Sequence, residues 1–295
     1  MISYRSIREL VDAAASSGRK ISEVVIEDQV RATGQSAAEL CREMHSRLGV
    51  MKESLQKGLS KGNLSPSGLS GKDATLFQEA MTGGKLLGGR FFDGAVLKAI
   101  AIAEVNASMG RIVAAPTAGS CGILPALLLT AAEELGTSEE EQVRALFTAS
   151  GTGMVIAKIA GVSGAVGGCQ AECGSASAMA AAAVVEMAGG TPEQSAHACA
   201  IALKNILGLV CDPVAGLVEV PCIKRNAGGA ANALVAVDLA LAGIKSVIPV
   251  DEVIQAMRQI GQAMPNTLKE TALGGLAATP TGCRLAKQLA PETCA

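Results

Sequence analysis

The chain has 295 residues, enough for one large domain or two ordinary ones, and 49% of them are hydrophobic. Its net charge is −2, with acidic and basic residues mixed along the chain, which disfavours a nucleic-acid-binding protein. Aromatic residues make up only 2% of the chain, whereas it contains 34 glycines and many alanines. This composition favours helices that pack closely through small side chains.

The N-terminus carries charged residues, among them Arg5, Arg8 and Glu9, and no apolar segment typical of a secretory signal. We therefore expect a cytoplasmic protein. In a reducing compartment the nine cysteines are packing residues, reactive thiols or metal ligands, not a disulfide framework. Cys41 and Cys199 lie in helical patterns, and we expect both to be small buried residues.

Helix starts are indicated, in chain order, by Ser or Thr followed three residues later by Glu or Gln. The pairs are Ser6 with Glu9, Ser36 with Glu39, Ser138 with Glu141, and Thr191 with Gln194. Pro192 strengthens the last signal, which predicts a helix over about residues 192–208. Strand signals are almost missing, so we predict an all-α fold, an Ala/Gly-rich, closely packed multi-helix domain with an N-terminal helical region.

A polar stretch rich in Gly, Ser and Lys interrupts the helical patterns. It divides the chain into an N-terminal helical region at residues 1–56, a linker or long loop at 57–72, and a helical domain at 73–295. The division is soft, and one continuous domain is the alternative.

Residues 112–132 form an uncharged window long enough to cross a membrane, in a chain whose mean hydropathy is +0.36. Pro116 and Pro125 interrupt it, as do several Gly, Ser and Thr residues. We predict a buried core helix preceded by a functional loop, and no membrane association. The alternative is a transporter whose broken helix binds an anionic substrate.

Three segments carry candidate chemistry. A Gly-rich segment from Val162 surrounds Cys169 and Cys173, and the segment A-P-T-A-G-S-C-G from Ala115 precedes a predicted helix near Ile123. Both present backbone N–H groups and hydroxyls near a helix start, which suits a carboxylate substrate. Alternatively, these glycines serve close helix crossings and the hydroxyls only cap helices.

The third segment is C-D-P-V-A-G-L-V-E-V-P-C, in which Cys211 and Cys222 are framed by prolines and a glycine. The cysteine spacing by itself is weak evidence for a metal site. The chain has only two histidines, His45 and His197, both in helical contexts, so a bound metal would depend on thiolates. Such ligands favour an iron–sulfur cluster over a Mg, Mn or Zn centre.

Long strings of the chain resemble the iron–sulfur-dependent bacterial L-serine dehydratases, most closely the alpha, or catalytic, subunit of the two-subunit type. The matching strings include S-G-A-V-G-G-C-Q-A-E-C-G-S-A, L-K-N-I-L-G-L-V-C-D-P-V-A-G-L-V-E-V-P-C-I-K-R-N-A and K-E-T-A-L-G-G-L-A. The resemblance implies an all-α catalytic domain, a [4Fe-4S] cluster, and conversion of L-serine to pyruvate and ammonia.

The resemblance also implies roles for individual residues. Three cysteines match cluster ligands, with Cys173 an extra: Cys169, Cys211 and Cys222. The open iron would act as a Lewis acid on the substrate. Candidates for binding the substrate or supporting its charge are Thr117, Gly119, Ser120, Lys224, Arg225 and Asn226. For Lys224 and Arg225 the alternative is a solvated pair beside the loop.

In single-chain relatives a terminal cysteine occupies the open iron until substrate displaces it. Here Cys283 and Cys294 are both candidates for this displaceable fourth ligand, and a plain tail thiol is the alternative for each. The family's Ser-Ser-His-Thr type motif is absent from the sequence. We therefore expect a beta subunit that completes the site, with the catalytic base on it, in an oligomeric enzyme.

Three other readings compete with this one. A pyridoxal-phosphate dehydratase would use Lys158, Lys204 or Lys224 for its Schiff base, but its α/β cofactor fold is not indicated. The remaining alternatives are the broken-helix transporter and a non-enzymatic helical scaffold.

Overall fold

The computed structural model describes residues 4–60 and 63–289, in which the chain forms thirteen α-helices and no β-strand. This confirms the all-α prediction. The helices are α1 (Ile7–Ser17), α2 (Ile21–Thr33), α3 (Ala37–Leu59), α4 (Asp73–Thr82), α5 (Gly89–Ala107), α6 (Ile123–Leu135), α7 (Glu139–Ile159), α8 (Gly164–Gly167), α9 (Ser175–Met187), α10 (Pro192–Lys204), α11 (Cys222–Leu241), α12 (Val250–Ala263) and α13 (Pro280–Leu289).

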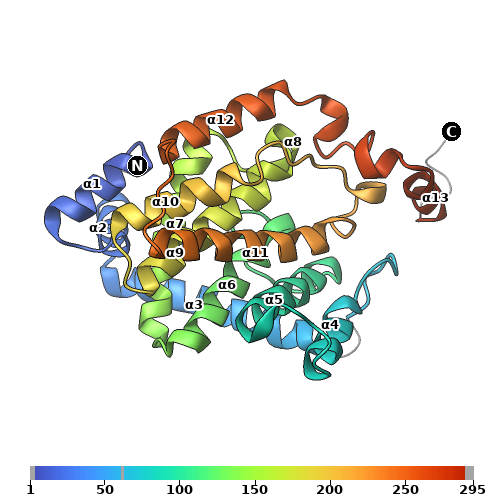
Figure 1. The fold of residues 1–295 in the computed structure, drawn as a ribbon, viewed down its shortest axis with the longest axis horizontal. Coiled ribbons are helices and arrows are strands. Elements are labelled where there is room, and N and C mark those ends of the chain that lie inside the picture. The colour runs from blue at the N-terminus through green and yellow to red at the C-terminus, as the bar shows by residue number, and fades with distance from the viewer. Residues whose placement is uncertain (1–3, 61–62, 290–295) are drawn as a thin grey trace.

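Helix α9 lies at the centre of the fold, packed among α6, α7, α10 and α11 (Figure 1). Every residue from Ser175 to Glu186 is buried, and half of them are alanines. Small side chains let neighbouring helices approach closely around this helix. The Ala-rich, aromatic-poor composition therefore corresponds to a core of closely packed helices.

The predicted helix starts are largely observed. Complete capping boxes form at Ser36, Ser138 and Thr191. At the first start the Ser6 hydroxyl accepts from the backbone N–H of Glu9 at 3.0 Å, but the Glu9 carboxylate accepts from the backbone N–H of Arg5 instead. The helix predicted over residues 192–208 is α10, which ends four residues earlier at Lys204.

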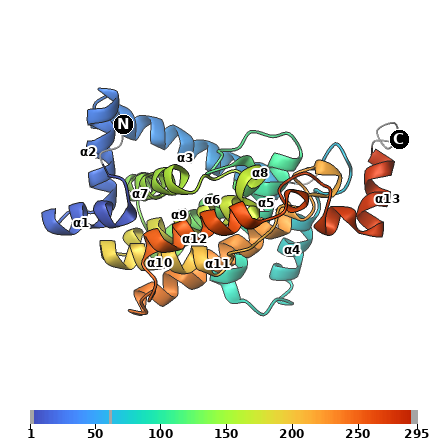
Figure 2. The same ribbon diagram turned by 90° about the horizontal axis from the view of Figure 1, so that it is seen from above.

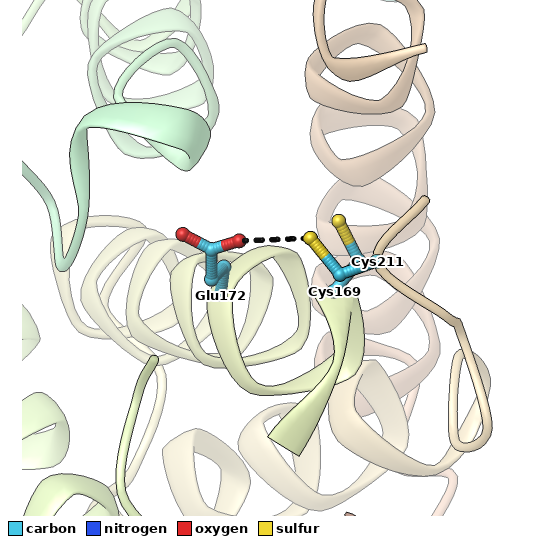
Figure 3. A group of neighbouring side chains, drawn as sticks. All are labelled: Cys169, Glu172 and Cys211. Atoms are coloured by element: carbon cyan, nitrogen blue, oxygen red, sulfur yellow. Dashed lines mark hydrogen bonds between the residues drawn. The ribbon is translucent and has the colours of Figure 1, made fainter. Parts of the chain in front are cut away.

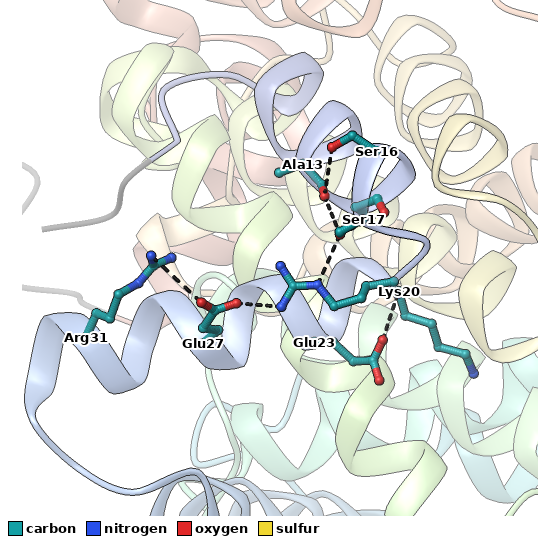
Figure 4. A network of polar contacts seen from close by, with 9 residues as sticks. Ala13, Ser16, Ser17, Lys20, Glu23, Glu27 and Arg31 are labelled. Carbon is teal, nitrogen blue, oxygen red and sulfur yellow. Dashed lines mark hydrogen bonds and ion pairs between the residues drawn. The ribbon is translucent and has the colours of Figure 1, made fainter.

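An exposed polar network joins the end of α1 to α2 (Figure 4). The Arg19 guanidinium donates to the Ser17 hydroxyl at 3.0 Å and pairs with Glu27, which also lies 3.8 Å from Arg31. Exposed ion pairs of this kind add little stability. The α1–α2 pair is held to the rest of the fold by buried apolar residues, among them Leu10 and Val25.

The apolar window near residue 120 is a core element. One stretch of the described residues, Ala118–Leu135, is long and apolar enough to cross a membrane, and 72% of it is buried inside the fold. Its helix α6 begins at Ile123, as predicted, after a loop and a short 3₁₀ turn. This matches a core helix preceded by a loop.

Helix α3 continues to Leu59 and packs on α5 and α7. One connected apolar core includes side chains from α1–α3, α5–α7 and α9–α12. The division into residues 1–56, 57–72 and 73–295 remains a prediction. Both views place α1 and α13 at opposite ends of the molecule (Figures 1 and 2).

Candidate metal centre

A cavity of about 310 Å³ opens where four loop segments meet. All three segments singled out by the sequence contribute to it, and a fourth segment near residue 270 does so as well. The residues that line it are Thr117, Ala118, Gly119, Val162, Ser163, Cys169, Glu172, Cys211, Pro213, Val218, Cys222 and Glu270. The cavity thus gathers three thiols, two carboxylates and two hydroxyls from segments far apart in the chain.

Cys169 is brought to the cavity by the residues on either side of it. Gly168 has φ +76°, and a Cβ there would lie 2.9 Å from the carbonyl oxygen of Leu209, so the close approach requires glycine. The fully buried Gln170 donates its backbone N–H to the Leu209 carbonyl at 2.9 Å, and its side chain accepts from the N–H of Gly208 at 2.9 Å. These bonds fasten the Cys169 turn to the chain that leads into Cys211.

Cys211 is held on its other side by the fourth segment. Its backbone N–H donates to the carbonyl of Leu268 at 2.8 Å, and its carbonyl accepts from the N–H of Glu270 at 2.7 Å. Cys222, in contrast, is the first residue of α11. A thiolate at a helix N-terminus is favoured by the helix dipole and the free backbone N–H groups.

Cys169, Glu172 and Cys211 form the tightest group, with ligand atoms within 4.8 Å of one another (Figure 3). The Cys211 Sγ lies 4.0 Å from Oε2 of Glu172, within hydrogen-bonding range for sulfur. Cys222 lines the same cavity outside this group. Two of the three cysteines expected from the resemblance are therefore in close contact, and the third faces the same space.

The thiols differ in their protonation. Hydrogen bonds from Cys173 and Cys211, assisted by the Arg225 charge, hold the pKa of Cys169 well below the ordinary thiol value. The hydrogen bond to Cys169 and burial raise the pKa of Cys211, and burial with the neighbouring Cys169 charge raises the pKa of Cys222 to about 12. A metal bound by these sulfurs would displace the protons of Cys211 and Cys222.

Glu172 is buried beside these sulfurs. Burial raises its pKa to about 7, against a hydrogen bond from the Thr117 side chain, which lowers it. A carboxyl group with a pKa near 7 can take up and release a proton at neutral pH. Glu172 was not among the site residues predicted from the sequence. Its position three residues after Cys169, on the same side of a helical turn, was the available signal.

Arg225 lies behind the cysteines and does not line the cavity. Its guanidinium pairs with Asp212 at 2.8 Å and donates to the Val210 carbonyl at 2.7 Å, and it also contacts Cys169. The side chains of the pair are only 16% and 4% exposed. Arg225 is thus a buried cation that faces the thiols, not one member of a solvated pair.

The other candidate substrate-binding residues are distributed unevenly. Thr117 and Gly119 line the cavity, whereas Ser120 is fully buried and its hydroxyl lies 3.0 Å from that of Thr117. Asn226 is buried and bonds to backbone groups of the surrounding loops. Lys224 is exposed and pairs with Asp73 at the start of α4.

The remaining cysteines lie outside the cavity lining. Cys173 is buried behind Cys169, Cys199 is fully buried in α10 as predicted, and Cys41 is half-buried against the core. Cys283 is exposed on α13, with its Sγ 3.7 Å from the carbonyl oxygen of Ala277. Cys294 lies outside the described residues.

Residues 16–277 match the family described as serine dehydratase alpha chain. The chain is 54% identical to the probable L-serine dehydratase alpha chain of Bacillus subtilis, over 97% of this chain and 95% of that one. It is 45% identical to the L-serine dehydratase alpha chain of Peptoniphilus asaccharolyticus, over 97% of this chain and 98% of that one. The L-serine dehydratase of Mycobacterium tuberculosis is 39% identical over 93% of this chain but 61% of that longer protein.

Proposed function

This chain belongs to the serine dehydratase alpha chain family, and we propose that it is the catalytic subunit of an L-serine dehydratase. The reaction is an ammonia-lyase reaction: L-serine loses its α-proton and its hydroxyl as water, and the resulting aminoacrylate rearranges and hydrolyses to pyruvate and ammonia. One observation carries the proposal. Cys169, Cys211 and Cys222 line one cavity together with hydroxyl and carboxylate groups.

We propose an iron–sulfur cluster, [4Fe-4S], as the cofactor. The donor set fits it, because thiols are the ligands such clusters use and Cys169, Cys211 and Cys222 are buried at one cavity. The cationic Arg225 behind them offsets part of the negative charge of a thiolate-bound cluster. When bound by three thiolates, the cluster supplies a Lewis acid for the hydroxyl that leaves the substrate.

The residues of the chain orient the substrate in this proposal. Thr117 and the backbone at Gly119 face the cavity and are candidates for binding the substrate carboxylate, and the buried Ser120 hydroxyl holds Thr117. Asn226 fixes the Gly119 loop to α11. Arg225 supports negative charge from outside the cavity, whereas Lys224, exposed and paired with Asp73, stays only a predicted candidate.

We propose a beta-chain partner that adds the catalytic base. The relatives from Bacillus and Peptoniphilus are named as alpha chains, and the Mycobacterium L-serine dehydratase is much longer than the part that matches this chain. A second polypeptide would supply what the longer enzyme carries itself. If this chain turned over fully without a partner, the base would have to be one of its own groups, with Glu172 the first to replace.

The displaceable fourth ligand stays a proposal with two candidates. Cys283 is exposed near the segment that follows Glu270, and Cys294 is closer to the end of the chain. Replacement of each by Ser, with the cluster absorption followed before and after L-serine is added, separates them. The residue whose loss removes the serine-dependent change is the ligand.

The lysine positions favour this proposal over a pyridoxal-phosphate enzyme. Lys158, Lys204 and Lys224 are all exposed, and none of them lines the cavity. A Schiff-base lysine needs a sheltered site beside its substrate. The buried α6 likewise favours a globular enzyme over a broken-helix transporter, and we propose a cytoplasmic location, where thiols stay reduced.

The decisive experiment is anaerobic purification of the chain with and without the beta partner, followed by iron and sulfide analysis and a pyruvate assay with L-serine. We expect iron and sulfide in both preparations and rapid pyruvate release only with the partner. Absence of iron and sulfide from both would overturn the cofactor proposal and favour a scaffold role. Full activity of the isolated chain would overturn the partner proposal.

A further inference from the structure

Glu270 has an unusual backbone conformation at the edge of the cysteine cavity. Its φ is +61°, in the left-handed region that non-glycine residues seldom adopt, and two residues later Ala272 has φ +55°. Such a conformation persists only where surrounding contacts impose it, and it is concentrated at functional sites. The fold therefore holds this residue in a conformation with an energetic cost.

The contacts that hold Glu270 come from the cysteine loop itself. Its backbone N–H donates to the carbonyl of Cys211 at 2.7 Å, and a few residues later the backbone N–H of Leu276 donates to the Asp212 carboxylate at 2.7 Å. The segment between them is fastened at both ends to two adjacent residues of the cysteine loop. Glu270 consequently keeps a defined position relative to Cys211.

The side chain of Glu270 lines the cavity and is exposed at its opening. Among the described residues it makes no side-chain hydrogen bond or ion pair. The other carboxylate of the lining differs in this respect, because Glu172 is buried and already bonded to Thr117 and Cys211. Glu270 is therefore the carboxylate that remains available to a ligand entering the cavity.

The charge of the lining suits a cationic group on that ligand. Of the described residues that line the cavity, two are glutamates and none is Lys, Arg or His. Arg225, which contacts Cys169 from outside the lining, is engaged by Asp212 and by the carbonyl of Val210. A ligand with only anionic groups would therefore meet no cationic side chain in this lining. Its only positively charged partner would be a bound metal centre.

We propose that Glu270 binds the α-ammonium group of the substrate and thereby makes the cavity specific for amino acids over the corresponding hydroxy acids. The inference rests on the proposed function, in which the carboxylate and hydroxyl of L-serine are bound elsewhere in the cavity. The ammonium group then lies toward the free carboxylate at the opening. A charge-assisted hydrogen bond between the two excludes analogues that lack the amine.

The test compares L-serine with 3-hydroxypropanoate, which keeps the carboxylate and the hydroxyl but lacks the amine. Each is mixed with the cluster-loaded alpha–beta enzyme in a stopped-flow instrument, as wild type and as Glu270→Gln, and binding is read from the change in cluster absorption before L-serine is turned over. We expect the substitution to weaken L-serine binding about 10- to 100-fold and to leave 3-hydroxypropanoate binding within about twofold. Glu140→Gln, at an exposed position in the first turn of α7, is the matched control and should change neither.

Equal weakening of both ligands would indicate a distorted cavity and overturn the proposal, as would unchanged L-serine binding. Selective weakening of L-serine by Glu172→Gln instead of Glu270→Gln would also overturn it. Because the readout is binding, it is separate from the proposed reaction. A wild-type enzyme that binds L-serine but releases no pyruvate would contradict the proposed function and leave the test of Glu270 valid.

Discussion

The side-chain N–H of Asn226 donates to the backbone carbonyl of Gly119 at 2.7 Å, across 107 residues of sequence. The same amide also donates to the carbonyl of Cys222 at 2.9 Å, and its oxygen accepts from the N–H of Gly122 at 2.9 Å. One buried side chain therefore links the hydroxyl-bearing loop to the cysteine at the start of α11. This link explains why the two loops face the same cavity.

Asn226→Ala should destabilise the fold and loosen the site, because it removes three buried hydrogen bonds, to the carbonyls of Gly119 and Cys222 and to the N–H of Gly122. We expect a loss of about 3 kcal/mol in the free energy of unfolding, measured by urea denaturation. Asn232→Ala on the same helix is the control. It removes a partly exposed amide bonded to the Ala202 carbonyl and should cost less than about 1 kcal/mol. Equal losses would show that Asn226 has no special part in the site.

Replacement of the cavity cysteines should separate cluster ligands from packing residues. Cys169→Ser, Cys211→Ser and Cys222→Ser should each lose most iron and sulfide after anaerobic reconstitution, because a serine hydroxyl binds iron poorly. Cys199→Ala, a fully buried change in α10, should keep both at the wild-type level. A Cys222→Ser variant with full iron and sulfide would remove Cys222 from the ligand set.

Gly164→Ala should impair the site more than the fold. An added Cβ there would lie 2.5 Å from Oε2 of Glu172 and 3.1 Å from the Sγ of Cys211, so it would displace the carboxylate. We expect kcat/KM for L-serine to fall about tenfold or more. The control is Gly228→Ala on α11, where the new methyl group would have no atom of another segment within 4 Å. This variant should gain about 0.5–1 kcal/mol of stability. Unchanged kcat/KM in Gly164→Ala would mean that the cavity wall adapts freely.

Removal of one partner of the buried Arg225–Asp212 pair should be costly, because an unpaired charge stays buried. We expect Asp212→Asn to lose about 3 kcal/mol of unfolding free energy. The comparison is Arg8→Gln, which breaks the exposed pair with Asp12, whose side chains are 72% and 53% exposed, and should cost less than about 0.5 kcal/mol. Similar losses in the two variants would contradict a buried role for Arg225.

Glu104 should make stability fall as pH rises. Burial, the largest effect, raises its pKa above the ordinary glutamate value, although its carboxylate accepts hydrogen bonds from the backbone N–H groups of Gly71, Asp73 and Ala74. Above about pH 4.3, the unfolded value, the folded chain therefore binds more protons at this group than the unfolded chain does. The resulting loss of stability continues until pH passes the folded pKa.

The measurement is the difference in unfolding free energy between wild type and Glu104→Gln, followed by urea denaturation of the metal-free chain from about pH 4 to 7. Wild type should lose stability relative to the variant as pH rises through this window. A constant difference would show that Glu104 has the same pKa in both states. The metal-free chain is used so that acid loss of a cluster does not contribute.

Local signals predicted much of the fold. The capping boxes at Ser36, Ser138 and Thr191 depend on side chains only three residues from the backbone groups they bind, so the pattern itself contains the interaction. The scarcity of strand signals and the wealth of alanine predicted the all-α core. The box at Ser6 formed only in part, because the Glu9 carboxylate had a competing donor in the Arg5 backbone N–H.

The sequence by itself determined the class of fold, several helix starts and the loops that carry the cysteines, because all of these depend on neighbours in the chain. Only the tertiary structure decided which side chains share the cavity. Glu172 and Glu270 face the same sulfurs, and Arg225 turns to Asp212 behind them, through contacts between distant segments. Such contacts depend on how the helices pack around α9, and that packing cannot be predicted from the spacing of residues in the sequence.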